Sequence, residues 1–319
     1  MKQILGIIVL IEFIGTIILG TYFLNYFETW QEAYLQGLFA AVSATTNAGF
    51  DITGSSLIPF ANDYFVQIIN IILLTLGAIG FPVLLELKDY LKHKKIYQRS
   101  HFSLYTKLTT VTFFSLMLFG TLVILLFEWN HFFADKSWHE SIFYAFFQSS
   151  TTRNGGLATM DVSAFSNPTL LALCFLMFIG ASPSSVGGGI RTTTFAVILL
   201  VIYSFSKGQK DIKVFRRELD PEDIRKSVVV TFLAIMICFI ALVILSATES
   251  FTLMQLMFEI SSAFGTTGLI TPELSSIGKM VVIALMFIGR IGILSFIFIF
   301  HHKDHEVNYH YPKERIIVG

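Results

Sequence analysis

The stretch FEISSAFGTTGL, residues 258–269, ends a short apolar segment with glycine and threonine residues that disfavour a regular helix. The apolar part runs from 251 to 264 and holds about 14 residues, whereas a helix needs about 20 to cross the hydrocarbon core. Shorter segments of this kind are typical of re-entrant helices. The stretch therefore predicts a pore helix that enters the membrane, stops and returns as an extended glycine loop.

The same arrangement occurs twice earlier, with short apolar segments at 31–44 and 138–149. When the loops are aligned on Gly49, Gly156 and Gly268, each copy has a Phe ten positions earlier and a Ser six positions earlier. The matched residues are Phe39, Phe146, Phe258, Ser43, Ser150 and Ser262, and Phe50, Leu157 and Leu269 follow the glycines. Phe is frequent in this chain, so the Phe match alone would fit chance similarity. The ordered set at near-equal spacing indicates copies of one structural unit.

Long apolar runs flank each short segment, at 4–24, 64–87, 108–127, 169–205, 228–247 and 280–300. The run at 169–205 is too long for one span and contains GASPSSVGGG at 180–189, which predicts a break. We predict an all-α membrane protein of span–pore helix–span units around a pseudo-symmetric cation pore. The units are expected at 1–90, 91–207 and 208–302, with a tail at 303–319.

The composition favours the bilayer as solvent. The chain is 54% hydrophobic and 14% charged, against about 25% charged residues in soluble domains. Its net charge of zero gives no indication of nucleic-acid binding. Cys174 and Cys238 lie within apolar runs and are read as packing residues, because no spacing typical of a metal site accompanies them.

The distribution of Lys and Arg predicts the orientation. Basic residues concentrate at 88–107, at 207–226, in the tail and at Lys2, whereas the opposite side has only Lys136, Arg153 and Lys279. Cytoplasmic segments carry the excess of Lys and Arg. We therefore expect a multi-pass protein of the cell membrane with both termini in the cytoplasm.

The loops themselves suggest a binding site for a monovalent cation. Irregular backbone at membrane depth is tolerated where it is packed in protein or lines a wet cavity. Glycine lets such backbone aim carbonyl oxygens at one axis, where they replace the hydration shell of an ion. Uncharged oxygens favour K+ or Na+ over a divalent ion, which usually recruits carboxylates. The predicted filter residues are Thr46, Asn47, Ala48, Gly49, Arg153, Asn154, Gly155, Gly156, Gly265, Thr266, Thr267 and Gly268.

Acidic residues on the predicted outer side have two readings. They could raise the cation concentration at the pore mouth, or they are ordinary solvated loop charges. The residues are Glu28, Asp51, Asp63, Glu128 and Asp161.

A broken segment halfway along a pore-lining span could obstruct conduction, although a kink made for packing is the simpler alternative. Its residues are Gly180, Ala181, Ser182, Pro183, Ser184, Ser185, Val186, Gly187, Gly188, Gly189 and Ile190. Arg290 lies inside the last span, where an arginine usually faces protein or a water-filled cavity. We expect it to face the inner cavity below the filter.

Together these features resemble the Trk/Ktr/HKT superfamily of potassium transporters, most closely the KtrB membrane subunits. The match is carried by Thr45-Thr46-Asn47-Ala48-Gly49-Phe50, Thr151-Thr152-Arg153-Asn154-Gly155-Gly156, Ser262-Ala263-Phe264-Gly265-Thr266-Thr267-Gly268-Leu269, Gly289-Arg290-Ile291-Gly292 and the tail Tyr311-Pro312-Lys313-Glu314-Arg315, ending in Val318-Gly319. The resemblance implies uptake of K+ through the filter, a gate loop at 180–190 and an inner-cavity arginine at Arg290. Na+ coupling stays open.

The resemblance also implies partners. It predicts a homodimer on a cytoplasmic KtrA-like ring of nucleotide-binding RCK subunits, while this chain itself binds no cofactor beyond the transported cation. The basic segments 88–107 and 207–226 would help docking, although anionic membrane lipid is their simpler partner. The superfamily has four units and this chain shows units two to four. A truncated chain or misassigned start is favoured over a first unit supplied by another polypeptide.

Two other functions fit less well. A solute carrier with broken helices would show paired inverted repeats, whereas these units share one orientation. An intramembrane enzyme would need a catalytic pair or HExxH within the spans, and the predicted spans contain no histidine. We therefore predict a transporter and not an enzyme.

Overall fold

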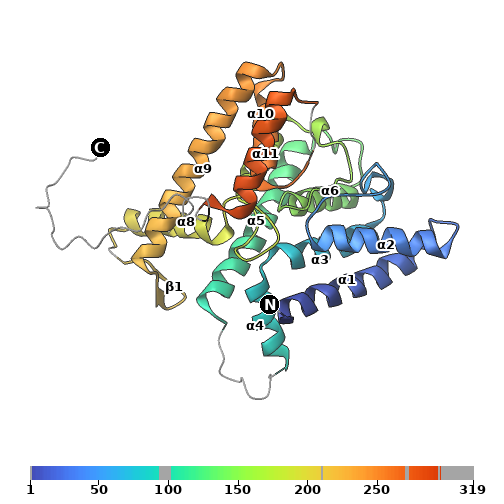
Figure 1. The fold of residues 1–319 in the computed structure, drawn as a ribbon, viewed down its shortest axis with the longest axis horizontal. Coiled ribbons are helices and arrows are strands. Elements are labelled where there is room, and N and C mark those ends of the chain that lie inside the picture. The colour runs from blue at the N-terminus through green and yellow to red at the C-terminus, as the bar shows by residue number, and fades with distance from the viewer. Residues whose placement is uncertain (1, 93–101, 210, 270–272, 294, 296–319) are drawn as a thin grey trace, which may run out of the picture.

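The computed structural model describes residues 2–92, 102–209, 211–269, 273–293 and 295. Most of these residues are helical (Figure 1). The predicted tail at 303–319 and the basic residues Lys94, Lys95, Arg99 and Lys210 lie outside the described residues.

The helices fall into three consecutive sets. The first set is α1 (Lys2–Phe23), α2 (Trp30–Thr45), the 3-10 turn η1 (Ile58–Phe60), α3 (Tyr64–Ala78) and α4 (Phe81–Lys92). The middle set is α5 (Leu104–Glu128), α6 (Trp138–Thr151), η2 (Val162–Ala164), α7 (Asn167–Phe178) and α8 (Thr192–Ser206). A hairpin of β1 (Lys213–Val214) and β2 (Arg217–Glu218) precedes the last set, α9 (Pro221–Thr248), α10 (Leu253–Gly265) and α11 (Ser276–Ile291).

The three short helices predicted between the spans are confirmed as α2, α6 and α10, within two residues at each end. Hydroxyl side chains explain where they start, because they satisfy the first free N–H groups of each helix. Thr29 accepts from the backbone of Glu32, and Ser137 and Thr252 form capping boxes with Glu140 and Gln255. Each helix ends where its glycine loop begins.

The second predicted span is wrong as one continuous helix. Helices α1, α5 and α9 are each long and apolar enough to cross a membrane, but α3 and α4 are bent by 104° relative to each other. The bend lies at Gly80, which takes a φ of +100°. Pro82, in the first turn of α4, has no N–H to continue the ladder from α3. The first set therefore has a broken second span, like the middle set.

The break predicted in the run 169–205 is confirmed, since α7 ends at Phe178 and α8 starts at Thr192. In the last set, α11 ends at Ile291 and Gly292 has a φ of +90°. The end of the predicted span 280–300 lies outside the described residues.

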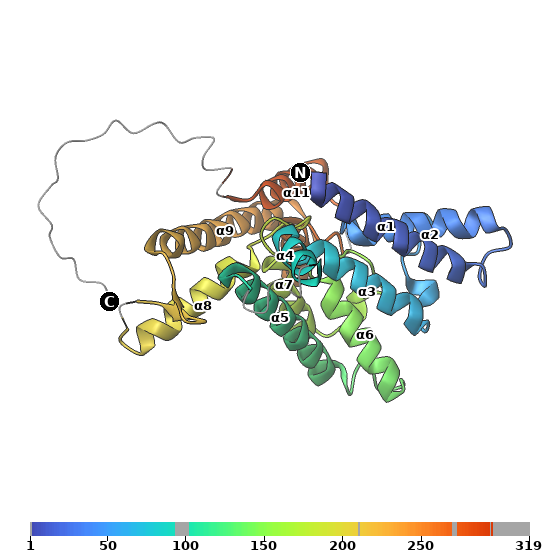
Figure 2. The same ribbon diagram turned by 90° about the horizontal axis from the view of Figure 1, so that it is seen from below.

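The sets pack in the order of the chain. Helix α2 packs on α1 and α3, α6 on α5, and α10 on α9 and α11. Between sets, α3 contacts α6 and α7 contacts α10. The middle set therefore contacts both the first and the last set, and Figures 1 and 2 show the helices from two sides. The contacts between the sets thus follow the order of the chain.

Candidate functional site

All three glycine loops share one backbone conformation. Gly49, Gly156 and Gly268 have φ values of +72°, +71° and +79°. The residues two positions earlier are also left-handed, although none of them is glycine: Asn47, Asn154 and Thr266. This region of φ is unfavourable for L-residues. Its recurrence at equivalent positions in three loops therefore reflects the repeat. The repeat read from the sequence extends to the backbone geometry.

The loops meet in space although more than a hundred positions separate them in the chain. A Cβ atom on Gly49 would lie 2.9 Å from the Cα of Gly156, and one on Gly156 would overlap the carbonyl oxygen of Thr267. Asn154 joins the middle loop to the last, because its amide donates to the Gly265 carbonyl and to the Thr266 hydroxyl. Among the described residues, a Cβ on Gly268 would meet no atom within 4 Å.

Hydroxyl groups fix the residue that follows each loop glycine. Ser43 Oγ donates to the Phe50 carbonyl at 2.6 Å, and Ser262 Oγ donates to the Leu269 carbonyl at 3.2 Å. In the middle loop Thr151 takes this role, donating to the Leu157 carbonyl at 2.6 Å. Each loop is therefore held at both ends by its own pore helix.

Arg153 connects the middle loop to the 180–190 loop. Its side chain is 1% exposed and lies over the ring of Phe113, 5.2 Å from the ring centre. Nη1 donates to the Ile179 carbonyl at 2.7 Å and Nη2 to the Gly180 carbonyl at 2.8 Å. These carbonyls stand where α7 breaks and have lost their helical partners. A predicted filter residue thus stabilises the start of the predicted gate loop.

The 180–190 loop lies directly against the glycine loops. A Cβ on Gly187 would lie 2.6 Å from the Asn154 amide carbon, and one on Gly188 would lie 2.6 Å from the Thr266 side chain. Backbone pairing holds the loop from the other side, where Ser182 N donates to the Ala78 carbonyl at 3.0 Å. Ala78 is the last residue of α3, so this hydrogen bond comes from the bend between α3 and α4.

Two further contacts hold the 180–190 loop. Tyr105 on α5 donates its hydroxyl to the Pro183 carbonyl at 2.6 Å, and Arg191 donates to the Gly187 carbonyl.

Sequence reasoning missed Tyr105 and the α3–α4 bend. One signal was present: Gly180 and Gly292 each follow their loop glycine by 24 positions, and Gly80 follows Gly49 by 31. The second span of every set has a glycine near its break.

Arg290 is exposed in the last turn of α11. It carries the same positive charge as Arg191, next to the end of the 180–190 loop, and the two charges repel each other. The neighbouring Gly289 carbonyl lies 3.0 Å from where a Cβ of Gly188 would stand. Arg290 therefore belongs to the surroundings of this loop.

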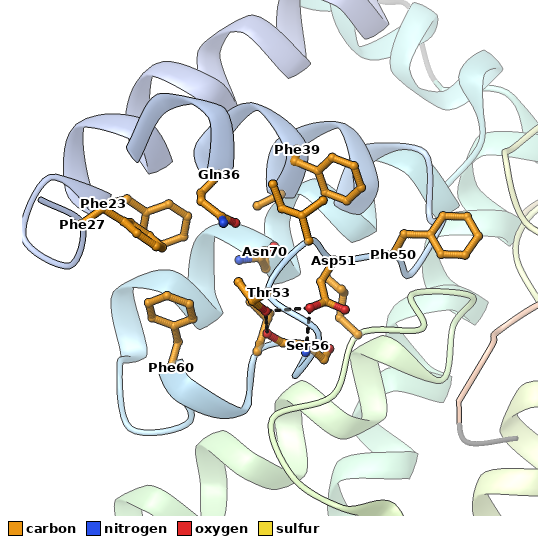
Figure 3. Close-up of a pocket in the computed structure, with 14 residues that line it drawn as sticks. Phe23, Phe27, Gln36, Phe39, Phe50, Asp51, Thr53, Ser56, Phe60 and Asn70 are labelled. Carbon is orange, nitrogen blue, oxygen red and sulfur yellow. Dashed lines mark hydrogen bonds between the residues drawn. The ribbon is translucent and has the colours of Figure 1, made fainter. Parts of the chain in front are cut away.

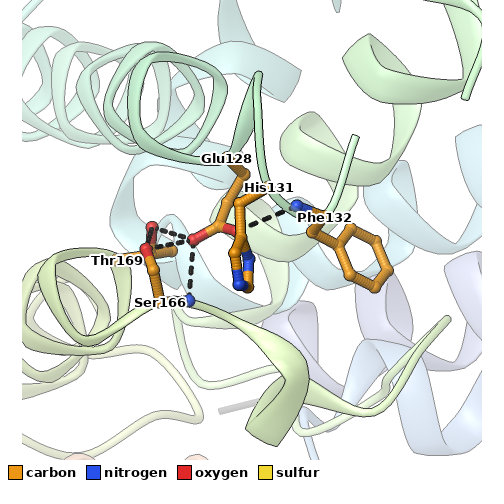
Figure 4. Close-up of polar contacts among 5 residues, drawn as sticks. All are labelled: Glu128, His131, Phe132, Ser166 and Thr169. Atoms are coloured by element: carbon orange, nitrogen blue, oxygen red, sulfur yellow. Dashed lines mark hydrogen bonds and ion pairs between the residues drawn. The ribbon is translucent and has the colours of Figure 1, made fainter. Parts of the chain in front are cut away.

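Some of the acidic residues expected on the outer side link the ends of helices. Glu128 at the end of α5 is fully buried, and its Oε1 accepts from the Ser166 N–H at 2.9 Å and the Thr169 hydroxyl at 2.5 Å (Figure 4). Oε2 accepts from His131 Nδ1 at 2.9 Å. Ser166 is the N-cap of α7, so Glu128 ties the end of one span to the start of the next.

The other sets have the same acidic link. Asp63 caps α3 and accepts the Tyr26 hydroxyl at 2.5 Å, which raises the pKa of Tyr26 to about 12. Glu249 follows α9 and accepts from the hydroxyl and N–H of Ser275, the N-cap of α11. The Ser275 hydroxyl holds the pKa of Glu249 below its usual value. Asp63 and Glu128 are thus structural, neither free charges nor plain loop charges.

Asp51 and Asp161 also have local roles. Asp51 lies beside a cavity of only about 30 Å³ and accepts from the Thr53 hydroxyl and from the N–H groups of Ser55 and Ser56 (Figure 3). Asp161 caps η2 through Ser163. Within the residues that the structure describes, no group of three or more His, Cys, Asp or Glu side chains could hold a metal ion.

Comparison with known proteins assigns this arrangement to a family. The family model TrkH, described as "Cation transport protein", matches residues 1–310. The chain belongs to the TrkH family of cation transport proteins. The resemblance read from the loop motifs is thereby confirmed, and so is the helical membrane fold. The crystal structure of the potassium transporter TrkH from Vibrio parahaemolyticus has the same fold, with a TM-score of 0.71 at 19% identity. It matches 90% of this chain and 62% of its own.

Similar curated members of the TrkH family carry names that refer to uptake. The chain is 59% identical to the Ktr system potassium uptake protein D of Bacillus subtilis, over all of this chain and 71% of the relative. It is 34% identical to the Ktr system potassium uptake protein B of the same organism, over 97% of this chain and 69% of the relative. It is 33% identical to the potassium/sodium uptake protein NtpJ of Enterococcus hirae, over all of this chain and 71% of the relative.

Proposed function

We propose that this TrkH-family chain takes up K+ across the cell membrane by conduction through the three glycine loops. The observation that carries the proposal is their shared geometry, with left-handed glycines at equivalent positions and mutual contact. Such loops present uncharged backbone oxygens to a common line, and these replace the water shell of a monovalent cation. The names of the Bacillus relatives support K+ as the main ion.

The 180–190 loop is proposed as the gate. It packs against the middle and last glycine loops. Arg153 and Tyr105 each donate one hydrogen bond to its backbone, and several backbone hydrogen bonds join it to the α3–α4 bend; all of these bonds end on carbonyl oxygens. Hydrogen bonds to backbone carbonyls can be exchanged for bonds to water, so such a loop can move without unfolding a helix. Arg290 and Arg191 would place positive charge beside it, at the inner mouth.

The name "Ktr system" refers to an assembly, and we propose that this chain also works with partner subunits. The homodimer and the cytoplasmic nucleotide-binding ring belong to this proposal. So does the orientation, with the segments rich in Lys and Arg in the cytoplasm.

Potassium rescue tests the function. The gene is expressed with a ring subunit in cells that lack K+ uptake, and growth is followed at low K+. We expect growth with the natural chain and none with Gly268→Asp, whose carboxylate would stand at the filter while the protein still inserts. Shortening the 180–190 loop should raise ungated flux. Absence of growth despite confirmed membrane insertion would refute the proposal, and unchanged flux in the shortened variant would refute the gate assignment.

A further inference from the structure

An open apolar groove runs between α5 and α8, away from the glycine loops. Its volume is about 480 Å³. Six residues of α5 line it at the spacing of one helix face, from Leu108 to Phe119. Leu199 on α8 and Phe175 on α7 form other walls, and both are about half exposed. The described part of the chain leaves this groove uncovered.

The dimensions fit one lipid chain. From Leu108 to Phe119 the helix rises about 16 Å, at about 1.5 Å per residue. The hydrocarbon core of a bilayer is about 30 Å thick, so one leaflet spans about 15 Å. Leu108 lies one turn from the start of α5, so the groove extends from the end of the helix to mid-membrane depth.

The β1–β2 hairpin contributes two apolar residues to the lining of the groove and has two basic residues beside them. Val214 and Phe215 line the groove, and both views place the hairpin beside the N-terminal end of α5 (Figures 1 and 2). Val214 pairs with Arg217 across the hairpin, so these two side chains share a face. Arg216 follows Phe215 in the turn. Lys213 and Glu218 form the next pair on the opposite face, where their charges offset each other.

The backbone keeps Phe215 and Arg216 in place against their preference. Their φ values are +49° and +63°, in a two-residue turn that usually takes Asn or Gly. Within the described residues, neither Arg216 nor Arg217 makes an ion pair, and Lys226 pairs instead with Glu222 on α9. Two exposed arginines, without an ion pair in the described part of the chain, therefore directly follow the lining residues Val214 and Phe215.

We infer that this groove binds an anionic phospholipid, with an acyl chain along α5 and α8 and the phosphate at Arg216 and Arg217. The planar guanidinium offers paired donors to phosphate oxygens. The hairpin belongs to the basic segment 207–226, expected on the cytoplasmic side, where anionic lipids give a negative surface. The site is separate from the proposed ion pathway, so the result of a lipid-binding test does not depend on whether the chain takes up K+.

Lipid titration followed by native mass spectrometry tests the site. The purified chain is titrated with phosphatidylglycerol and with phosphatidylcholine of the same acyl chains. Each basic residue at an anionic surface contributes about fivefold to binding, so the natural chain should prefer phosphatidylglycerol by about thirty-fold. The double variant Arg216→Gln/Arg217→Gln should lose that preference. Leu199→Trp should fill the groove and weaken binding of both lipids.

The matched control removes two exposed lysines from α4, which does not line the groove. Lys88→Gln/Lys92→Gln should keep the preference of the natural chain. Equal binding of both lipids by the natural chain, or equal loss in the control, would overturn the inference. So would an unaffected Leu199→Trp variant. Crosslinking of two chains through Ser115→Cys in the membrane would assign the groove to a second copy instead.

Discussion

The middle and last glycine loops occupy equivalent places in the repeat but differ in how they are held. Arg153 in the middle loop is buried and donates to two carbonyls of the α7 break. The equivalent position in the last loop is Gly265, which packs its backbone against the Met177 carbonyl. The middle loop has a neighbouring loop on both sides, whereas a Cβ on Gly268 in the last loop would meet no atom of the described residues within 4 Å.

The same difference appears where the first helix of each set ends. Glu128 in the middle set is fully buried, whereas its counterpart Glu249 in the last set is partly exposed. A repeat therefore supplies equal geometry, but the neighbours of a copy decide how much protein surrounds each residue. Substitutions at equivalent positions should differ in effect accordingly.

The largest effect is expected for Gly156→Ala compared with Gly268→Ala. Both place a Cβ at a left-handed φ, which costs about 1–2 kcal/mol. Only the Ala at 156 would also overlap the Thr267 carbonyl, which belongs to the neighbouring loop. We expect Gly156→Ala to reduce rubidium uptake at least about tenfold more than Gly268→Ala, since each 1.4 kcal/mol is a factor of ten. Equal losses at equal membrane levels would show that crowding between loops is unimportant.

The second effect concerns the link between the middle loop and the 180–190 loop. Arg153→Met removes two charge-assisted hydrogen bonds to buried carbonyls, and we expect a loss of about 3 kcal/mol in unfolding free energy. Thermal unfolding of the detergent-solubilised chain measures it. The control is Thr46→Val, the equivalent position in the first loop, where the hydroxyl only bonds to Val42 of its own helix at 2.7 Å.

Arg153→Lys separates charge from geometry. Lysine keeps the positive charge but cannot reach both carbonyls with a planar fork. We expect it to recover only part of the stability and to show more uptake in the absence of the ring subunit than the natural chain. Full recovery by lysine would mean that the charge matters and the link to the 180–190 loop does not.

The smallest effect compares Glu128→Gln with Glu249→Gln. Glutamine at 128 would turn an N–H₂ group toward buried donors, and we expect a loss of about 2 kcal/mol. At 249 the loss should be smaller, because water can replace the bonds to Ser275. The pKa of Glu249 is lowered on folding, so its contribution is present above its unfolded pKa and is lost as the pH falls through the folded value.

The difference between the natural chain and Glu249→Gln should therefore shrink in acid. Unfolding midpoints measured near neutral and at acidic pH test this. If the difference between the two unfolding midpoints grew in acid, folding would not lower the pKa of Glu249.

The amino-acid order by itself determined the pore helices, the loop glycines and the break in the span at 169–205. These are local or periodic properties: apolar length, Thr and Ser caps such as Thr252, and glycines at fixed spacing. The family followed from the same motifs. The prediction of one continuous span at 64–87 was wrong. Gly80 and Pro82 lie within an uninterrupted apolar run, and hydropathy alone does not detect a bend in such a run.

Only the tertiary structure decided what each equivalent residue touches. Arg153 is read in the sequence as a filter residue, but its side chain reaches carbonyls 26 and 27 positions away. Glu128 has two readings in the sequence, a charge that attracts cations to the mouth or an ordinary loop charge, but folding buries it against the start of α7. Spacing along the chain specifies backbone conformation, whereas the partners of a side chain depend on which copies of the repeat become neighbours when the helices pack.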